Sequence, residues 1–142
     1  MLDEEKFIVY AVGESGSRDI VVARSDGTFR EVQIDHPADD FAPVWSPSYD
    51  RIAYLSNRDG NVEVYISAAD GSSAMRVTNT GVDESQITWA PEGDRVSFVS
   101  PDENGHPRVF WVWMKNLILN QLVFESDNEI DPAWSPQGKW IA

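Results

Sequence analysis

The chain has 142 residues, no cysteine and a formal net charge of −13. This length suits one domain or part of one, and the lack of cysteine excludes disulfides, thiolate metal sites and a thiol nucleophile. The negative charge disfavours nucleic acids and anionic membranes as partners. No apolar run approaches the roughly 20 residues of a membrane-spanning helix. The acidic N-terminal sequence is not a signal peptide as written, which favours a cytoplasmic location.

A tryptophan motif divides the chain into repeats. Its copies contain Trp45, Trp89 and Trp134, which are 44 and then 45 residues apart. A fixed period of this length is typical of radial or stacked repeat folds. The repeat frame therefore predicts the architecture more strongly than any local pattern does.

Each full repeat is expected to hold four short strands, A to D, with the tryptophan in strand A. Strands B to D of the first repeat fall within residues 6–35. Residues 40–79 and 84–125 hold two complete repeats, and residues 129–142 begin a further one with its strand A. Strand D of the first repeat is out of step by one residue, which predicts a bulge or a shifted pairing.

The turn residues fit the same frame. Asp-Gly pairs at 26–27 and 70–71 are expected to close hairpins between strands C and D. Pro-x-Gly sequences suit the tight turns between strands A and B. Tyr49 stands where such a glycine is expected, so its turn should be strained or of another type. Four strands every 44 residues or so predict an all-β chain of antiparallel β-propeller blades, about three in number.

The repeat resembles the WD-like propeller repeat of the TolB family. The likeness rests on Trp-Ser-Pro at 45–47, Ile-Ala-Tyr at 52–54, Ser-Asn-Arg-Asp-Gly at 56–60, Val-Tyr-Ile at 64–66 and Arg-Val-Thr at 76–78. Similar blades occur in the propellers of tricorn-type and prolyl-oligopeptidase-type peptidases and in lyases. The resemblance therefore implies a fold and no particular activity. It would imply a periplasmic location if this sequence is part of an exported TolB-like protein.

Three blades fall short of the four to eight that typically close a propeller. Open sheet edges at both ends would be an aggregation hazard. We therefore expect a homodimer that forms one six-bladed propeller, in which residues 131–136 of a partner copy supply the first blade's strand A. The alternative is that further blades of a longer chain complete the propeller. Residues 139–142 favour this alternative, because they restart a strand B that residues 6–9 already supply.

The loops between strand D of one repeat and strand A of the next are acidic. Residues 35–41, 79–86 and 125–131 carry nine of the chain's 24 acidic residues and no lysine or arginine. A funnel lined by one sign of charge focuses its field, so we expect this acidic loop face to bind a protein or peptide partner, possibly a basic one, or a cation. The residues expected to take part are Asp39, Asp40, Asp83, Glu84, Glu129 and Asp131. The alternative is that each carboxylate accepts hydrogen bonds from backbone N–H groups of its own loop.

Aromatic residues outside the repeat motif offer a second candidate surface. Trp113 aligns with Arg24 and Ala68 in the other repeats, so its position need not be buried. Together with Trp111 and Trp140 it is expected either to form a contact surface or to pack in the core of a divergent blade.

No catalytic or metal-binding motif accompanies the acidic residues. Asp127, Glu129 and Asp131 alternate like the start of a calcium loop, but Pro132 stands where a glycine belongs. Two histidines without cysteine make a poor metal set, and no nucleophile-elbow sequence is present. We therefore expect a non-catalytic interaction module without metal or cofactor. The alternatives are the substrate-gating propeller of a serine peptidase and a propeller lyase or hydrolase.

Overall fold

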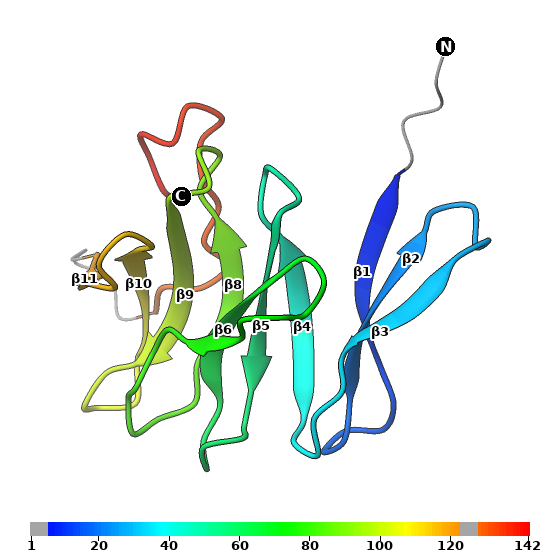
Figure 1. Cartoon of the computed structure of the whole chain (residues 1–142). Coiled ribbons are helices and arrows are strands. Elements are labelled where there is room, and N and C mark those ends of the chain that lie inside the picture. Colours follow the sequence, from blue (N-terminus) through cyan, green and yellow to red (C-terminus); the bar gives the residue numbers. More distant parts are fainter. Residues whose placement is uncertain (1–5, 123–127) are drawn as a thin grey trace.

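The computed structural model describes residues 6–122 and 128–142, which form three antiparallel sheets standing side by side (Figure 1). We call these sheets the first, second and third blades. The first blade contains β1 (Phe7–Val12), β2 (Asp19–Arg24) and β3 (Arg30–Ile34). The second contains β4 (Asp40–Trp45), β5 (Arg51–Ser56), β6 (Glu63–Ala68) and β7 (Met75–Arg76). The third contains β8 (Ser85–Trp89), β9 (Arg95–Pro101), β10 (Pro107–Trp113) and β11 (Leu119–Gln121).

This arrangement confirms the predicted fold class. Within each blade the strands pair with their neighbours in sequence, and the three sheets do not close into a ring. Residues 129–142 add a hairpin in which Trp134 bridges Ile141, and the amides of Ala133 and Ala142 each donate to the other's carbonyl at 2.9 Å. No helix in the described part of the chain is long and apolar enough to cross a membrane.

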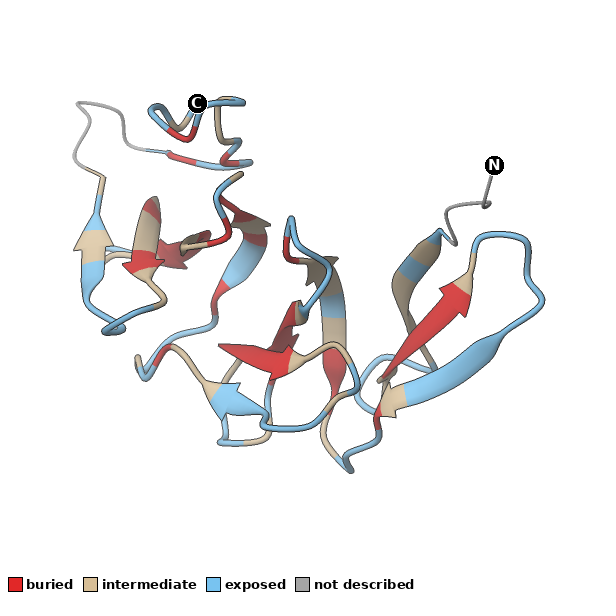
Figure 2. Cartoon of the chain, turned by 45° about the horizontal axis from the view of Figure 1, so that its top comes forward, coloured by how far each residue is buried: buried red, intermediate tan, exposed pale blue. Residues whose placement is uncertain are grey.

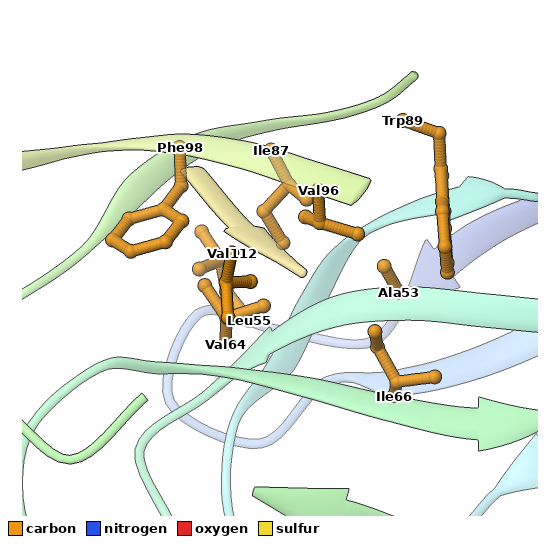
Figure 3. Close-up of a cluster of buried hydrophobic side chains, with 9 residues drawn as sticks. All are labelled: Ala53, Leu55, Val64, Ile66, Ile87, Trp89, Val96, Phe98 and Val112. Atoms are coloured by element: carbon orange, nitrogen blue, oxygen red, sulfur yellow. The ribbon is translucent and has the colours of Figure 1, made fainter. Parts of the chain in front are cut away.

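The hydrophobic core lies between the blades. Side chains alternate across a strand, so each sheet sends one set of apolar residues toward each neighbour. The cluster between the second and third blades is drawn in Figure 3, and it comprises Ala53, Leu55, Val64, Ile66, Ile87, Trp89, Val96, Phe98 and Val112. A second cluster joins the first and second blades through Ile20, Val22, Ile34, Ile52, Tyr54 and Tyr65. In Figure 2 the buried residues gather in the strands, whereas the outer strand β3 is mostly exposed. Each blade therefore depends on its neighbours for burial.

Register shifts bend the strands at repeated positions. The β2–β3 pairing shifts between Ile20 and Val21, which confirms the bulge predicted for strand D of the first repeat. Strands β4 and β8 also shift register, and each shift contains a non-glycine residue with positive φ, Ala42 at 50° and Gln86 at 53°. Asp131 has φ 52° at the same repeat position. This left-handed residue, three positions before each tryptophan, was not predicted from the sequence, because alanine and glutamine rarely adopt it.

The predicted strain at Tyr49 is also present. Its φ is 57°, close to the 72° of Gly93 and the 64° of Gly138 in the equivalent turns. In each case this residue's amide donates a 2.9 Å hydrogen bond to the carbonyl three residues earlier, so the turn geometry is retained. A left-handed non-glycine residue costs about 1–2 kcal/mol. The Tyr49 ring lies 6.0 Å from that of Trp45, a contact that offsets part of this cost.

Two arginines tie neighbouring blades together at the ends of the A–B turns. Arg51 Nη2 donates to the Gly93 carbonyl oxygen at 3.2 Å, and Arg95 Nη2 donates to that of Gly138 at 3.1 Å. The same guanidinium groups lie over the following repeat tryptophan, at 5.3 Å from Trp89 and 4.6 Å from Trp134. The first residue of strand B thus fastens one blade to the next.

The hairpin glycines provide a matched test of the packing between blades. Gly27 and Gly71 occupy equivalent turns with the same φ of 78°, but a Cβ at Gly71 would clash with the Gln33 carbonyl oxygen of the first blade, whereas Gly27 faces open space. We expect Gly27→Ala to cost about 1 kcal/mol from backbone strain alone. Gly71→Ala should cost about 1–3 kcal/mol more because the first blade must move. Urea unfolding of both variants measures the difference, and equal costs would contradict this account of the blade contact.

Candidate functional site

The acidic loops lie beside the loops between strands B and C. Hydrogen bonds join the two sets, since Arg18 before β2 contacts Asp39 and Arg58 after β5 contacts Asp40. Charges of the acidic loop face are therefore paired with arginines from neighbouring segments. Both arginines lie outside the acidic loops, so the sequence of these loops does not show them.

Asp39 is held by Arg18 of the first blade. Its carboxylate accepts bonds from the Arg18 backbone amide at 3.0 Å, from Nε at 2.7 Å and from Nη2 at 2.6 Å. These bonds lower the pKa of Asp39 to about 2, with burial opposing the shift. The Arg18 guanidinium also lies 4.1 Å from the centre of the Phe41 ring. Asp39 therefore anchors the second blade to the first.

Asp40 is fully buried, and its partner is Arg58 of the same blade. Arg58 Nη2 donates to both carboxylate oxygens, at 3.0 and 3.1 Å. The guanidinium packs over the rings of Tyr65 and Tyr54, 4.6 and 5.7 Å from their centres. Burial raises the pKa of Tyr54 to about 12. This ion pair is enclosed by the chain and leaves no free carboxylate oxygen.

The next acidic loop places Asp83 and Glu84 differently. Asp83 Oδ1 accepts a 2.7 Å bond from the backbone amide of Val62, and its residue is exposed. Glu84 is buried and accepts bonds from the hydroxyl groups of Thr80 at 2.6 Å, Ser100 at 3.1 Å and Thr78 at 3.2 Å. These partners of Glu84 are all hydroxyl groups.

Residues 128–131 are the described part of the third acidic loop. Glu129 is buried, its Oε2 accepts a 2.9 Å bond from the Val109 amide, and its Oε1 lies 3.7 Å from Arg108 Nη1. Asp131 is exposed, and its amide donates to the Gln86 side-chain oxygen at 2.7 Å. The calcium-loop pattern also included Asp127, which lies outside the described residues. Within residues 6–122 and 128–142, no three His, Asp or Glu side chains are grouped so that they could hold a metal ion.

One hydrogen bond recurs at all three junctions on this face. The amides of Asp40, Glu84 and Glu129 donate to the carbonyl oxygens of Arg18, Val62 and Pro107 in the preceding blade, each at 2.9 Å. The predicted set of acids thus sits at the seams between blades. Their observed contacts correspond to a structural role, with partners in neighbouring strands and blades as well as in their own loops. Binding of a partner through them stays a prediction.

The structure places the three remaining tryptophans in different settings. Trp113 is half-buried, with its ring 5.6 Å from that of Trp111 and the Arg95 guanidinium 5.0 Å from its centre. Trp140 is 75% exposed and makes no ring contact with them in the described structure. Trp113 therefore packs within the junction formed by Arg95 and Trp134.

A groove beside β1 is a candidate site that the sequence did not predict. It has a volume of about 600 Å³ and is lined by residues 7–9 of β1, residues 43–47 of β4 and its turn, Tyr49, Thr88 and Trp89. We call it the β1 groove. In the repeat frame β1 corresponds to β5 and β9, which pair on this side with β4 and β8. Among the described residues β1 has no such neighbour, and Ile8 is 49% exposed whereas its equivalents Ile52 and Val96 are fully buried.

The buried ion pair of Asp40 supports a stability prediction. Asp40→Leu leaves the Arg58 charge enclosed without its partner, so we expect a loss of about 3–5 kcal/mol in the free energy of unfolding. The double variant Asp40→Leu with Arg58→Met should lose less than the single variant, because no unpaired charge remains. Urea unfolding of both variants checks this, and a larger loss in the double variant would contradict it.

The Asp39 carboxylate supports a prediction about acid. Its pKa is lowered in the folded chain, so its contribution is present above the ordinary pKa near 4 and is lost as the pH falls toward 2. We expect about 1–2 kcal/mol of the free energy of unfolding to be lost over this window. Arg18→Met should abolish that part of the acid dependence. An unchanged acid profile in this variant, measured by urea unfolding at several pH values, would argue against the contact.

Comparisons with known proteins agree with the geometry. A family model for the TolB β-propeller domain matches residues 3–142. TolB from Acinetobacter baumannii is similar in structure, with a TM-score of 0.80 and 18% identity over 95% of this chain and 35% of that one. A protein assigned as TolB from Agrobacterium tumefaciens has a TM-score of 0.76 and 27% identity, over 94% of this chain and 52% of that one.

The fold is also shared with proteins of other activities. The tricorn protease matches with a TM-score of 0.63 and 16% identity, over 95% of this chain and 13% of that one. A search of curated proteins found no match. The chain spans about a third to a half of the two TolB structures. The repeats, the blade topology and the family model together show that the chain belongs to the TolB β-propeller domain family.

Proposed function

We propose that this chain is a non-catalytic interaction module whose partner is an extended polypeptide segment docked in the β1 groove. The observation that carries the proposal is the unpaired edge of β1 beside a groove of about 600 Å³. An exposed strand edge can accept another strand through backbone hydrogen bonds, while side-chain pockets give specificity.

The chemistry of the groove favours an apolar, aromatic segment. Phe7, Trp45 and Trp89 contribute rings to its lining, and Pro43 and Pro47 flank them. No acidic or basic side chain is among the lining residues. Such a surface suits a strand that carries its own tryptophan and prolines.

The segment that best fits this description is the repeat motif itself. Strands β4 and β8 carry the motif and lie where a partner of β1 would lie in the first blade. We therefore take the occupant to be residues 129–136 of a second copy, so that two copies form one six-bladed propeller. In this chain the same segment packs on the third blade, where Trp134 Nε1 donates to Ser97 Oγ at 3.0 Å. Its pairing with residues 141–142 of its own chain would be exchanged for pairing with β1 of the second copy.

Binding of a synthetic peptide with the sequence of residues 129–137 tests the groove directly. Ile8→Glu should abolish binding, because it places a charge at the half-exposed edge of β1. The matched control is Val32→Glu, which adds the same charge at an exposed position of β3. We expect the control to bind as the native chain does, and a peptide with alanine in place of tryptophan to bind at least tenfold more weakly. No binding of the native peptide would contradict the proposal.

Light scattering on a sizing column identifies the source of the segment. A dimer near twice 16.0 kDa that Ile8→Glu converts to a monomer supports the second copy. If the chain is a monomer and binds the peptide, the groove is a binding site but a second copy does not occupy it. A monomer that does not bind would overturn both parts.

The acidic loop face remains the alternative binding surface. A basic partner there would have to compete with Arg18 and Arg58 for the carboxylates of Asp39 and Asp40. Replacing Asp40, Glu84 and Glu129 together by their amides separates the roles. Loss of partner binding with the fold retained favours a binding face, whereas loss of the fold favours the structural role.

A further inference from the structure

The junction between the second and third blades contains two carboxyl groups where its neighbours contain an ion pair. Glu63 at the start of β6 and Glu84 just before β8 are both buried, with 0% and 2% of their surface exposed. Both carboxylates bind Thr80, since Glu63 Oε1 accepts from its backbone amide at 2.9 Å and Glu84 Oε1 accepts from its hydroxyl at 2.6 Å. Two buried carboxylates in contact repel unless one carries a proton.

Comparison of the repeats shows that this junction lacks the cations found at the others. Arg108 lies at the repeat position of Glu63, since Ser56 pairs with Glu63 and Ser100 pairs with Arg108. The third junction therefore sets Arg108 3.7 Å from Glu129. Similarly, Asp102 stands 44 residues after Arg58, so Glu84 has no counterpart of the cation that holds Asp40.

The hydrogen bonds leave one site for a proton between the two groups. Glu63 Oε1 accepts from Arg76 Nη2 at 2.7 Å, from the Thr80 amide at 2.9 Å and from Asn61 at 3.0 Å. Glu63 Oε2 is buried and has no hydrogen-bond partner within the described residues. A protonated Glu84 carboxyl would donate to this oxygen, and the pair would then carry one negative charge.

The surrounding charges favour retention of that proton. Arg76 is the cation at this site, and it is shared between Glu63 and Asp59, whose Oδ2 lies 3.5 Å from Nη1. Asp83 adds a further carboxylate on the same loop, and Ser100 is the contact from β9. Arg108 on β10 is engaged by Asp102 at 3.0 Å and by Glu129.

We propose that Glu63 and Glu84 share one proton and form a pH-sensitive latch between the second and third blades. With the proton in place, the pair contributes a hydrogen bond across the junction. Without it, two buried like charges push the 79–84 loop away from β6. Hydrogen bonds join Val62, just before β6, to Asp83 and Glu84 of this loop. These bonds should weaken together when the loop moves.

The direction of the pH effect follows from the folded chain's titration. Burial, and then the neighbouring Glu63, raise the pKa of Glu84 to about 7. Burial opposes ionisation of Glu63 as well, but hydrogen bonds that its carboxylate accepts, those from Arg76 and Asn61 among them, lower its pKa. A group whose pKa is raised on folding stabilises the folded state below its ordinary pKa and loses that effect as the pH rises through the folded value. The latch is therefore closed in mild acid and weakened above about pH 7.

Carboxyl-carbon NMR of the full chain, with glutamate labelled, tests the shared proton. We expect one glutamate to titrate near pH 7, and Glu84→Gln to remove that titration. Glu63→Gln should move it toward the ordinary range, because the facing charge is gone. The control Glu103→Gln, in an exposed loop, should leave it unchanged. If every glutamate titrates in the ordinary range, the proposal is wrong.

Hydrogen exchange tests the latch itself and remains informative if one variant is destabilised. Between pH 6 and pH 8, the protection factors of the Val62 and Glu84 amides should fall about tenfold after correction for intrinsic exchange. In Glu84→Gln the fall should be absent, and in Glu103→Gln it should persist. Protection that stays constant in the native chain, or a fall that survives in Glu84→Gln, would overturn the latch.

Discussion

The hydrogen bond between the start of each strand A and the preceding blade is the contact on which the other features depend. Asp40, Glu84 and Glu129 each donate their amide to a carbonyl oxygen at the beginning of strand C in the neighbouring blade. This bond fixes the position of each blade along the strand direction of its neighbour. With that position set, two repeat tryptophans donate to the preceding blade, Trp89 Nε1 to the Val44 carbonyl oxygen at 3.3 Å and Trp134 Nε1 to Ser97 Oγ at 3.0 Å.

Arginines at these junctions between blades explain how so acidic a chain can fold. Its 24 acidic residues face only 11 cations, and arginines occupy the seams. On the loop face Arg18 and Arg58 hold Asp39 and Asp40, and at the opposite end Arg51 and Arg95 lie over tryptophan rings. A planar guanidinium can bind a carboxylate and stack on a ring, which lysine does less well. Glu84 differs from these carboxylates because hydroxyl groups bind it, and in the proposed latch a proton replaces the arginine.

Burial between sheets also explains why the groove beside β1 is a reasonable docking surface. Each blade presents apolar residues toward both neighbours, and in the second blade both faces are covered. In the first blade Ile8 and Val32 remain about half exposed. Exposed apolar strand edges invite pairing with another segment. The proposed interaction through an added strand therefore rests on the exposed edge of β1 and on no activity found among proteins with this fold.

The repeat period, the turn residues and the alternation within strands determined the fold class from sequence alone, because they are local patterns with known spacing. They also predicted a strained or altered turn at Tyr49 and a bulge or shifted pairing in the first blade. The roles of the acidic residues could not be read in this way. Asp40 and Arg58 are 18 residues apart, and Asp39 and Arg18 are 21 apart, so only the tertiary structure brings them together. The positive φ of Ala42 and Gln86 could not be predicted from the sequence for a related reason. Their backbone is bent by pairing with the next strand, against the local preference of their side chains.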